Sequence, residues 1–232
     1  IFREAFGMMG LGESIDFLDR THDLPSINIL SVILQRCRER KDLLYAKNVY
    51  THICKYGLDD QKVLGNYIVP MFVDCGDVLN SCRFFQKLPH RNEFSWTSLL
   101  HAFINSGEES IAFNLYEQMK EENINPSKFT FPILINKCAE TSLEYMHWGL
   151  SIHDDIIREG FERDLFIGNA LVDMYGKWGA LIEAHEIFDE MLVRDEVSWT
   201  SLMTGYMDNG FITEALASLE YMKLEGTCSD EI

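Results

Sequence analysis

The 232-residue sequence predicts an all-α protein, a solenoid of antiparallel helix–turn–helix hairpins, and two internal repeats predict this class. The longer repeat is an identity of five residues, in which Ser95–Leu99 returns as Ser198–Leu202. The pair Gly65-Asn66 returns as Gly168-Asn169, displaced along the chain by the same number of residues. An identity that includes tryptophan, in register with a second match, indicates an internal duplication.

A shorter period lies inside each copy. Gly76, Gly107, Gly179 and Gly210 each stand ten residues after the members of the series Asn66, Thr97, Asn169 and Thr200. A small residue follows each glycine, then a bulky one, then Leu or Met: Ser81, Phe85 and Leu88; Ala112, Tyr116 and Met119; Ala184, Phe188 and Met191; Ala215, Leu219 and Met222. Spacings of three, four and seven place these side chains on one face of a second helix, and the glycine predicts a turn before it.

These landmarks predict six units. They are 27–61, 62–92, 93–127, 128–164, 165–195 and 196–230, with 1–26 as the end of a preceding unit. Pro89 and Pro126 fall between hairpins, where a residue that ends helices is expected. No Gly-rich or charged linker divides the chain, so we expect one continuous solenoid.

Composition agrees with a folded protein, since 47% of the residues are hydrophobic. No apolar run approaches the roughly 20 residues that span a bilayer, so no membrane partner is expected. The sequence starts without an initiator methionine or a targeting segment, which we interpret as a piece of a longer protein. Six scattered cysteines without a C-x-x-C pair predict reduced, mostly buried thiols.

The unit lengths and local motifs resemble the pentatricopeptide repeat (PPR) proteins of the plant PLS subclass, in which long, short and standard units alternate. Asn169–Lys177 looks like the short-unit consensus, and Val197–Leu202 looks like a standard unit. Phe129–Pro132, with Cys138 and the Gly160-Phe161 ending, looks like a long unit. The resemblance covers about 27–230, and the 128–164 unit departs from it by two extra residues near 141–148.

The resemblance implies a right-handed superhelix that binds single-stranded RNA at about one base per repeat. Two side chains per unit would read the base: Asn66 with Asn92, Thr97 with Ser127, Asn169 with Asp195, and Thr200 with Asp230. An apolar side chain per unit would wedge between bases: Val63, Phe94, Phe166 and Val197. The long units offer Ser31 with Gln61, and Pro132 with Asp164. The family code then implies the site pyrimidine–A–N–U–G.

Structural interpretations compete with several of these assignments. Taken without the family, an Asn or Thr at a helix start is usually an N-cap. Trp96 and Trp199 are interpreted as core between repeats rather than as stacking platforms, and His153 as a structural histidine. The net charge of −17 is unusual for a nucleic-acid binder. Arg36, Lys137 and Lys177 are the candidates for phosphate contacts, whereas Asp74 and Asp208 occupy equivalents of Lys177.

No catalytic or metal-binding motif accompanies the repeats. The sequence contains no P-loop, no nucleophile elbow and no zinc deaminase signature, so this segment is predicted to be non-catalytic and without a cofactor. The resemblance implies the recognition tract of an organellar C-to-U RNA-editing factor, in a mitochondrion or chloroplast. Editing cofactor proteins, or a deaminase domain in cis or trans, would be its partners. The alternatives are a protein-interaction scaffold and an RNA stabilisation or splicing factor.

Overall fold

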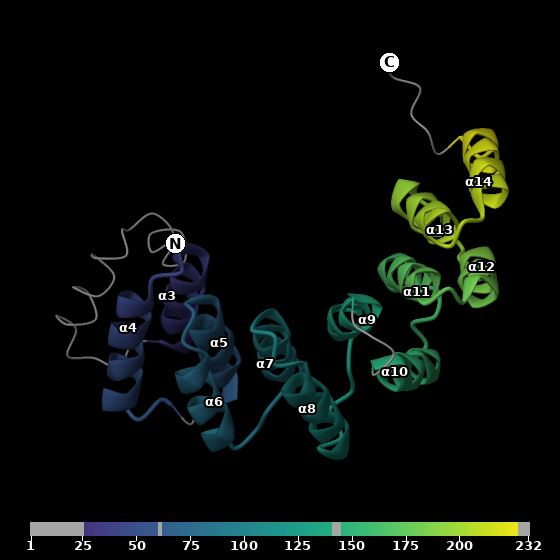
Figure 1. Ribbon diagram of the computed structural model, residues 1–232. Helices are drawn as coiled ribbons and strands as arrows, with labels where there is room; N and C mark the ends of the chain where they lie inside the picture. Colours follow the sequence, from purple (N-terminus) through teal and green to yellow (C-terminus); the bar gives the residue numbers. More distant parts are fainter. Residues whose placement is uncertain (1–25, 60–61, 141–144, 227–232) are drawn as a thin grey trace. The chain divides into compact units, whose positions relative to one another are not determined.

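The computed structural model describes residues 26–59, 62–140 and 145–226, and over these ranges it confirms the all-α class (Figure 1). Each of the helices in these ranges has ten to fourteen residues. None of the described helices is long and apolar enough to cross a membrane. The chain divides into two compact units, Ile1–Ile124 and Asn125–Ile232, and we describe each by itself.

In the first unit three hairpins follow one another along the chain. Their helices are α3 (Ile27–Arg40) and α4 (Leu43–Lys55), α5 (Lys62–Asp74) and α6 (Val78–Lys87), and α7 (Glu93–Asn105) and α8 (Glu109–Glu121). The first helices lie side by side, α3 against α5 and α5 against α7, and each also packs on its own second helix. The first helices therefore form one layer of this unit and the second helices the other.

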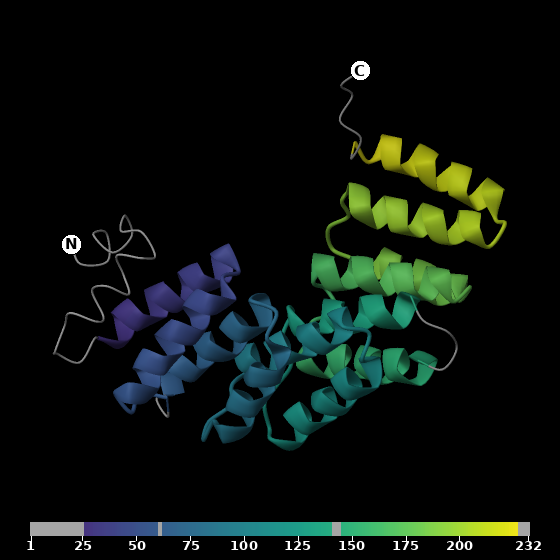
Figure 2. The ribbon, with the colours of Figure 1, turned by 60° about the vertical axis from the view of Figure 1, so that its left-hand side comes forward.

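The second unit repeats this arrangement (Figure 2). Its helices are α9 (Thr130–Glu140) and α10 (Met146–Glu159), α11 (Leu165–Lys177) and α12 (Leu181–Glu190), and α13 (Glu196–Asp208) and α14 (Ile212–Leu224). Helix α11 packs against both α9 and α13, so the first helices again form a layer. Three residues connect α11 to α12 and α13 to α14, and a connection this short between packed helices gives an antiparallel hairpin.

The predicted turns and core rows are confirmed. Gly76, Gly107, Gly179 and Gly210 have φ of 81°, 75°, 75° and 82°, in the left-handed region that glycine enters without steric cost. Five residues later, the small side chains of Ser81, Ala112, Ala184 and Ala215 are buried. Phe85, Tyr116 and Phe188 are buried, as are Leu88, Met119, Met191 and Met222, whereas Leu219 is only half-buried. The second helices thus turn the predicted face inward at every position but this one.

A cluster of Trp, Phe and Arg joins successive hairpins in both units. The Phe85 and Trp96 rings meet edge to face with centroids 4.6 Å apart, and the Phe188 and Trp199 rings do so at 4.7 Å. Trp96 and Trp199 are both buried, which confirms their interpretation as core between repeats. Edge-to-face pairs of this kind add about 0.5–1.5 kcal/mol beyond the burial of their area.

The arginine of each cluster closes one end of it. The Arg194 guanidinium lies 4.8 Å from the Phe188 ring centroid, and its Nε donates to the Phe188 carbonyl at 3.0 Å. Its Nη1 reaches the Glu225 carboxylate, after the end of α14, at 3.2 Å. Arg91 makes the same set of contacts with Phe85 and with Glu122. One side chain thus connects the second helices of two consecutive hairpins.

Glycine also permits a close approach of α11 and α13. A Cβ added to Gly176 would lie 3.0 Å from the Gly205 Cα, which is backbone and cannot turn aside. The Asn209 side-chain amide donates to the Gly176 carbonyl at 2.9 Å and to the Gly205 carbonyl at 2.8 Å. The Asn209 amide therefore links α11 and α13 where the two glycines allow their backbones to approach.

Candidate nucleic-acid interface

The predicted reading residues of the short and standard units lie one turn inside their helices, and they are not N-caps. The helices begin at Lys62, Glu93, Leu165 and Glu196, four residues before Asn66, Thr97, Asn169 and Thr200. The caps are instead the second members of the predicted pairs. Asn92 caps α7, Asp164 caps α11 and Asp195 caps α13. The sequence interpretation missed this role, although the spacings Asn92 to Ser95 and Asp195 to Ser198 are those of a capping box.

The structure brings one predicted pair into direct contact. The Asn169 Nδ2 donates to the Asp195 Oδ1 at 3.1 Å, across from α11 to the start of α13. The same Oδ1 accepts from the Ser198 backbone N–H and from the Ser198 hydroxyl, both at 2.9 Å. Side chains from two consecutive first helices therefore meet at one point, which is the geometry needed for two residues to contact one ligand group.

The Asp195 carboxylate is ionised at neutral pH. Its partial burial alone would raise the pKa, but hydrogen bonds from Ser198, Asn169 and the Val197 N–H outweigh the burial and lower the pKa below the usual range of aspartate. The position at the N-terminus of α13 favours the same negative charge. A fixed anionic acceptor therefore stands in the interface.

Asn66 and Asn169 each have an unsatisfied side-chain acceptor. The side-chain Oδ1 of each is buried and has no hydrogen-bond partner. An unpaired buried acceptor costs about 1–3 kcal/mol, so such an atom favours any ligand that donates to it. Pro70, inside α5, has no N–H to donate to the Asn66 carbonyl four residues earlier, so the backbone acceptor of the same residue also lacks its usual helical partner.

The remaining predicted readers have local hydrogen bonds. The Thr97 hydroxyl donates to the Glu93 carboxylate at 3.0 Å, and the Thr200 hydroxyl donates to the Glu196 carbonyl at 2.7 Å. The Ser127 hydroxyl accepts from the Phe129 N–H at 3.2 Å. Asp230, the expected partner of Thr200, lies outside the described residues.

The four wedge candidates are exposed apolar side chains. Val63, Phe94, Phe166 and Val197 have exposed fractions of 49%, 40%, 72% and 55%. Each stands three residues before a predicted reader, so the two share a helix face. The Arg38 guanidinium lies 5.3 Å from the Phe94 ring centroid and is held by Asp74 at 2.6 Å. The exposed rings of Phe94 and Phe166 leave surface that stacking on a base would cover.

The long-unit positions differ from the rest. Ser31 is half-buried and its hydroxyl donates to the Asn28 carbonyl at 3.0 Å, whereas Gln61 lies outside the described residues. Pro132 is half-buried within α9. Asp164 accepts from the backbone N–H groups of Phe166 and Ile167 as an N-cap. A capping role accounts for Asp164, and Pro132 offers no side-chain hydrogen bond.

Two of the three phosphate candidates are held by carboxylates of their own helices. The Lys177 Nζ lies 2.8 Å from the Asp173 carboxylate, and the Lys137 Nζ lies 3.6 Å from that of Glu140. Arg36 is half-buried in α3. Partly exposed ion pairs of this kind are worth about 0–1 kcal/mol, so a phosphate can compete for the lysines.

The acidic charge is unevenly distributed. Helix α12, a second helix, carries four carboxylates and no lysine or arginine: Glu183, Glu186, Asp189 and Glu190. The first helices α9 and α11 each carry one acid and one lysine, and α3 carries three arginines and one glutamate. The acidic exceptions are α13, with Glu196 and Asp208, and α7, with Glu93. The local field at most first helices is therefore weaker than the net charge of −17 suggests. Among the described residues no group of three or more His, Cys, Asp or Glu could hold a metal ion.

Stacked antiparallel hairpins with their first helices in one layer define a helical-repeat protein. Residues 91–140 match the PPR repeat family, and 169–195 and 197–227 match the PPR repeat. Two chloroplastic pentatricopeptide repeat-containing proteins of Arabidopsis thaliana are 30% and 31% identical to this chain over 224 and 206 residues. These alignments cover 97% and 88% of this chain but 36% and 39% of the relatives, so the chain spans less than half their length.

Solved structures show the same fold. The crystal structure of the pentatricopeptide repeat protein PPR10 in complex with an 18-nt psaJ RNA element matches 89% of this chain and 31% of that one, with a TM-score of 0.70 and 19% identity. PPR10 from maize alone matches 99% of this chain and 34% of that one, with a TM-score of 0.69 and 18% identity. Together with the repeat matches and the relatives, they support a pentatricopeptide repeat protein, as the sequence predicted.

Proposed function

We propose that this segment binds single-stranded RNA along its layer of first helices, at about one base per repeat. The observation that carries the proposal is the contact between Asn169 and Asp195, at 3.1 Å, beside the exposed ring of Phe166. A base stacked on Phe166 would present its edge to a polar pair contributed by two successive helices. PPR10, which has the same fold, is known in complex with RNA.

The chemistry of the pair favours uracil. The N3–H of uracil is a donor, whereas N3 of cytosine is an acceptor that an ionised carboxylate would repel. The lowered pKa of Asp195 keeps this acceptor charged. By the same reasoning the uncharged pair Asn66 and Asn92 would take either pyrimidine. With Thr97 and Ser127 on adenine, and with Thr200 and Asp230 on guanine, the proposed site is pyrimidine–A–N–U–G.

The repeat boundaries belong to the same proposal. We assign units 27–61, 62–92, 93–127, 128–164, 165–195 and 196–230 in a continuous solenoid, since each pair of described helices falls within one of them. Arg36, Lys137 and Lys177 would approach phosphates from the first helices. The weak cationic character of this layer predicts modest affinity that falls only gradually as salt rises, because few phosphate contacts release few counterions.

Fluorescence anisotropy with a labelled RNA containing the proposed site tests the function. Stacking contributes about 1–3 kcal/mol per base before ordering costs, so we expect a Kd of about 10⁻⁶ M or weaker at low salt. The matched control replaces the single uracil by cytosine, and a scrambled sequence is the second control. Equal binding of all three RNAs would show that the assigned code is wrong, and no binding at low salt would reject the function.

The whole protein is proposed to act in a mitochondrion or chloroplast, as chloroplastic relatives and a mitochondrial relative that is 32% identical over 182 residues suggest. The alternation of long, short and standard units favours an organellar C-to-U editing factor, with a deaminase domain in cis or trans. Sequencing of organellar transcripts in a plant without the protein tests this role: loss of C-to-U conversion beside the proposed site is expected. Altered splicing or transcript stability with intact editing would contradict it.

A second candidate function is a protein-interaction scaffold, in which the layer of first helices binds a polypeptide instead of RNA. The net charge of −17 favours it. The absorbance ratio at 260 and 280 nm of the chain purified at low salt separates the two candidates: a raised ratio, from copurifying nucleic acid, supports RNA binding over the scaffold.

A further inference from the structure

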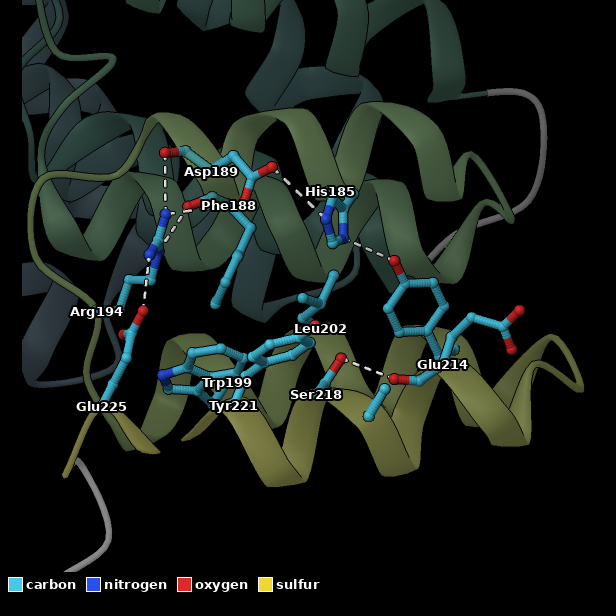
Figure 3. A pocket seen from close by; sticks show the side chains of 12 residues that line it. His185, Phe188, Asp189, Arg194, Trp199, Leu202, Glu214, Ser218, Tyr221 and Glu225 are labelled. Atoms are coloured by element: carbon cyan, nitrogen blue, oxygen red, sulfur yellow. Dashed lines mark hydrogen bonds and ion pairs between the residues drawn. The ribbon is translucent and has the colours of Figure 1, made fainter. Parts of the chain in front are cut away.

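A groove in the second unit lies on the side of the second helices. It has a volume of about 430 Å³, and its floor is α13 while α12 and α14 form its walls (Figure 3). A groove of this size accommodates one or two side chains of a ligand. Trp199 turns into it, whereas the adjacent Thr200 is exposed in the predicted reading row. The groove is therefore a surface separate from the candidate nucleic-acid interface.

The groove lining combines apolar surface with an excess of carboxylates. Asp189, Glu214 and Glu225 line it, against one arginine, Arg194. That guanidinium is already engaged by the carbonyls of Phe188 and Asp189 and by the Glu225 carboxylate. The Asp189 carboxylate makes only long contacts with positive or ring nitrogens, with His185 Nε2 at 3.5 Å and with Arg194 Nη2 at 3.8 Å. The groove consequently offers uncompensated negative charge.

A buried donor at the floor lacks an acceptor. Trp199 is 4% exposed, and its indole Nε1 has no hydrogen-bond partner. In Figure 3 the edge of the indole that carries this nitrogen points to the Glu225 end of the groove. The Glu225 side chain is half-exposed, so its displacement would admit a ligand carbonyl oxygen to the indole N–H. A buried unpaired donor costs about as much as a lost hydrogen bond, which favours such a ligand.

We propose that this groove binds a segment of a partner protein that presents one arginine side chain. The guanidinium would pair with the Glu214 carboxylate at one end of the groove, with Asp189 adding to the attraction, and a backbone carbonyl further along the segment would accept from the Trp199 indole at the other end (Figure 3). Arginine fits better than lysine, since its planar fork pairs with carboxylates and stacks on aromatic faces. The acidic α12 beside the groove attracts a cationic segment and repels RNA.

The first unit contains a matched control. Trp96 of α7 forms the corresponding floor there, with Phe85 of α6 in one wall and Arg91 at its end, in a groove of about 290 Å³. The Trp96 Nε1 also lacks a partner. However, no carboxylate lines this groove. The two grooves share the indole donor and differ in charge, so a ligand chosen by charge should distinguish them.

NMR of the whole chain, labelled with ¹⁵N at the tryptophan indoles, tests the proposal. The probe is a seven-residue peptide of glycine and leucine with one central arginine, and the control peptide carries the neutral analogue citrulline. We expect saturable movement of the Trp199 indole signal, assigned through W199F, with little movement of the Trp96 signal. The citrulline peptide and the E214Q variant should bind at least about threefold more weakly, as expected for partly exposed charge pairs. The E220Q variant, which removes a charge of α14 outside the groove, should bind normally.

Several outcomes would overturn the proposal. Equal binding of the two peptides, equal effects of E214Q and E220Q, or equal movement of the two indole signals would each exclude charge recognition in this groove. A chain that elutes as a dimer and shows no response to the peptide would assign the groove to a second copy.

Discussion

Replacement of Asp195 by asparagine separates its capping role from its proposed reading role. The amide oxygen of the introduced asparagine can still accept from Ser198 and cap α13, because Asn and Asp are about equally good N-caps. The charge is lost, however, and hydrogen bonds to a charged acceptor are worth about 1–1.5 kcal/mol more than neutral ones. With about 0.3–1 kcal/mol from the helix dipole, we expect D195N to lower the free energy of unfolding by about 1–2 kcal/mol.

The alanine variant should cost more. D195A removes the cap, at about 0.5–2 kcal/mol, and leaves the buried Asn169 amide without its acceptor, at about 1–3 kcal/mol. We therefore expect a loss of about 2–4 kcal/mol. Urea denaturation followed by circular dichroism measures both variants. D195N keeps the Oδ1 acceptor and D195A removes it. Equal destabilisation by the two variants would therefore show that this acceptor does not supply most of the stabilisation.

The pH dependence of the same comparison has a definite sign. Because the folded pKa of Asp195 is lowered, its stabilisation is fully present above the unfolded pKa of about 3.9 and is lost as pH falls through the folded value. The difference in stability between wild type and D195N should stay constant from about pH 7 to pH 5 and shrink below about pH 4. A difference that shrinks between pH 7 and 5 would mean that another group is responsible.

The RNA specificity of D195N follows from the uncharged pair that it creates. Asn169 with an asparagine as its partner has the composition of the Asn66 and Asn92 pair, so the preference for uracil over cytosine should fall by about tenfold, or about 1.4 kcal/mol. The reciprocal variant N92D should gain a preference for uracil at the first position while its cap remains. Anisotropy with the uracil and cytosine RNAs measures both. Unchanged preference in D195N would refute base reading by this residue.

Three further predictions concern packing and pH. G176V should lower the free energy of unfolding by about 1–3 kcal/mol through overpacking against Gly205. G176A should have a much smaller effect, because the higher helix propensity of alanine offsets part of the cost. Urea midpoints measure the stability of both variants. R194A should lower the protection of α14 amides in hydrogen exchange with little effect on α11, as its contacts join α12 to the end of α14. Burial lowers the pKa of His153, which contacts the Tyr175 hydroxyl at 2.8 Å. The free energy of unfolding of the wild type should therefore fall as pH drops through about 6.5, and that of H153Q should fall less.

Much of the fold was predictable because it depends on spacing along the chain. The glycine turns and the buried row of Ala184, Phe188 and Met191 follow from helical periodicity. The sequence predicted that Asn169 and Asp195 read the same base, but it did not predict the hydrogen bond between them. That bond depends on how far α13 is displaced from α11. The close approach at Gly176 sets that displacement, and a glycine in a helix does not by itself indicate which backbone it faces.

The groove and the charge distribution could not be predicted in the same way. Arg91 and Arg194, and likewise Glu122 and Glu225, are related by the shift of the long repeat, so the recurrence was visible in the sequence. Their pairing was not, since it joins residues of separate second helices. The acidic total was visible too, but its concentration on α12 becomes informative only when α12 is known to lie in the layer away from the predicted readers.

The start of α13 connects the two proposed binding surfaces, and this connection predicts that their equilibria are linked. Ser198 bonds to Asp195, Trp199 lies in the arginine groove, and Thr200 stands in the reading row, all within three consecutive residues. We expect a ligand that contacts Trp199 to alter the positions of Asp195 and Thr200, because the three residues lie together at the start of α13. Coupling between binding sites is reciprocal, so the arginine peptide should change the Kd of the RNA by the same factor as the RNA changes that of the peptide.

Anisotropy titrations of RNA with and without saturating peptide measure this factor, and E214Q supplies the control. A basic peptide also binds RNA directly, but that effect would be the same in E214Q, in which the groove is weakened and the reading row is intact. A change in RNA affinity present in wild type and reduced in E214Q therefore reports coupling through α13. An identical change in both proteins would show that the helix start transmits nothing, and the two surfaces would then be independent.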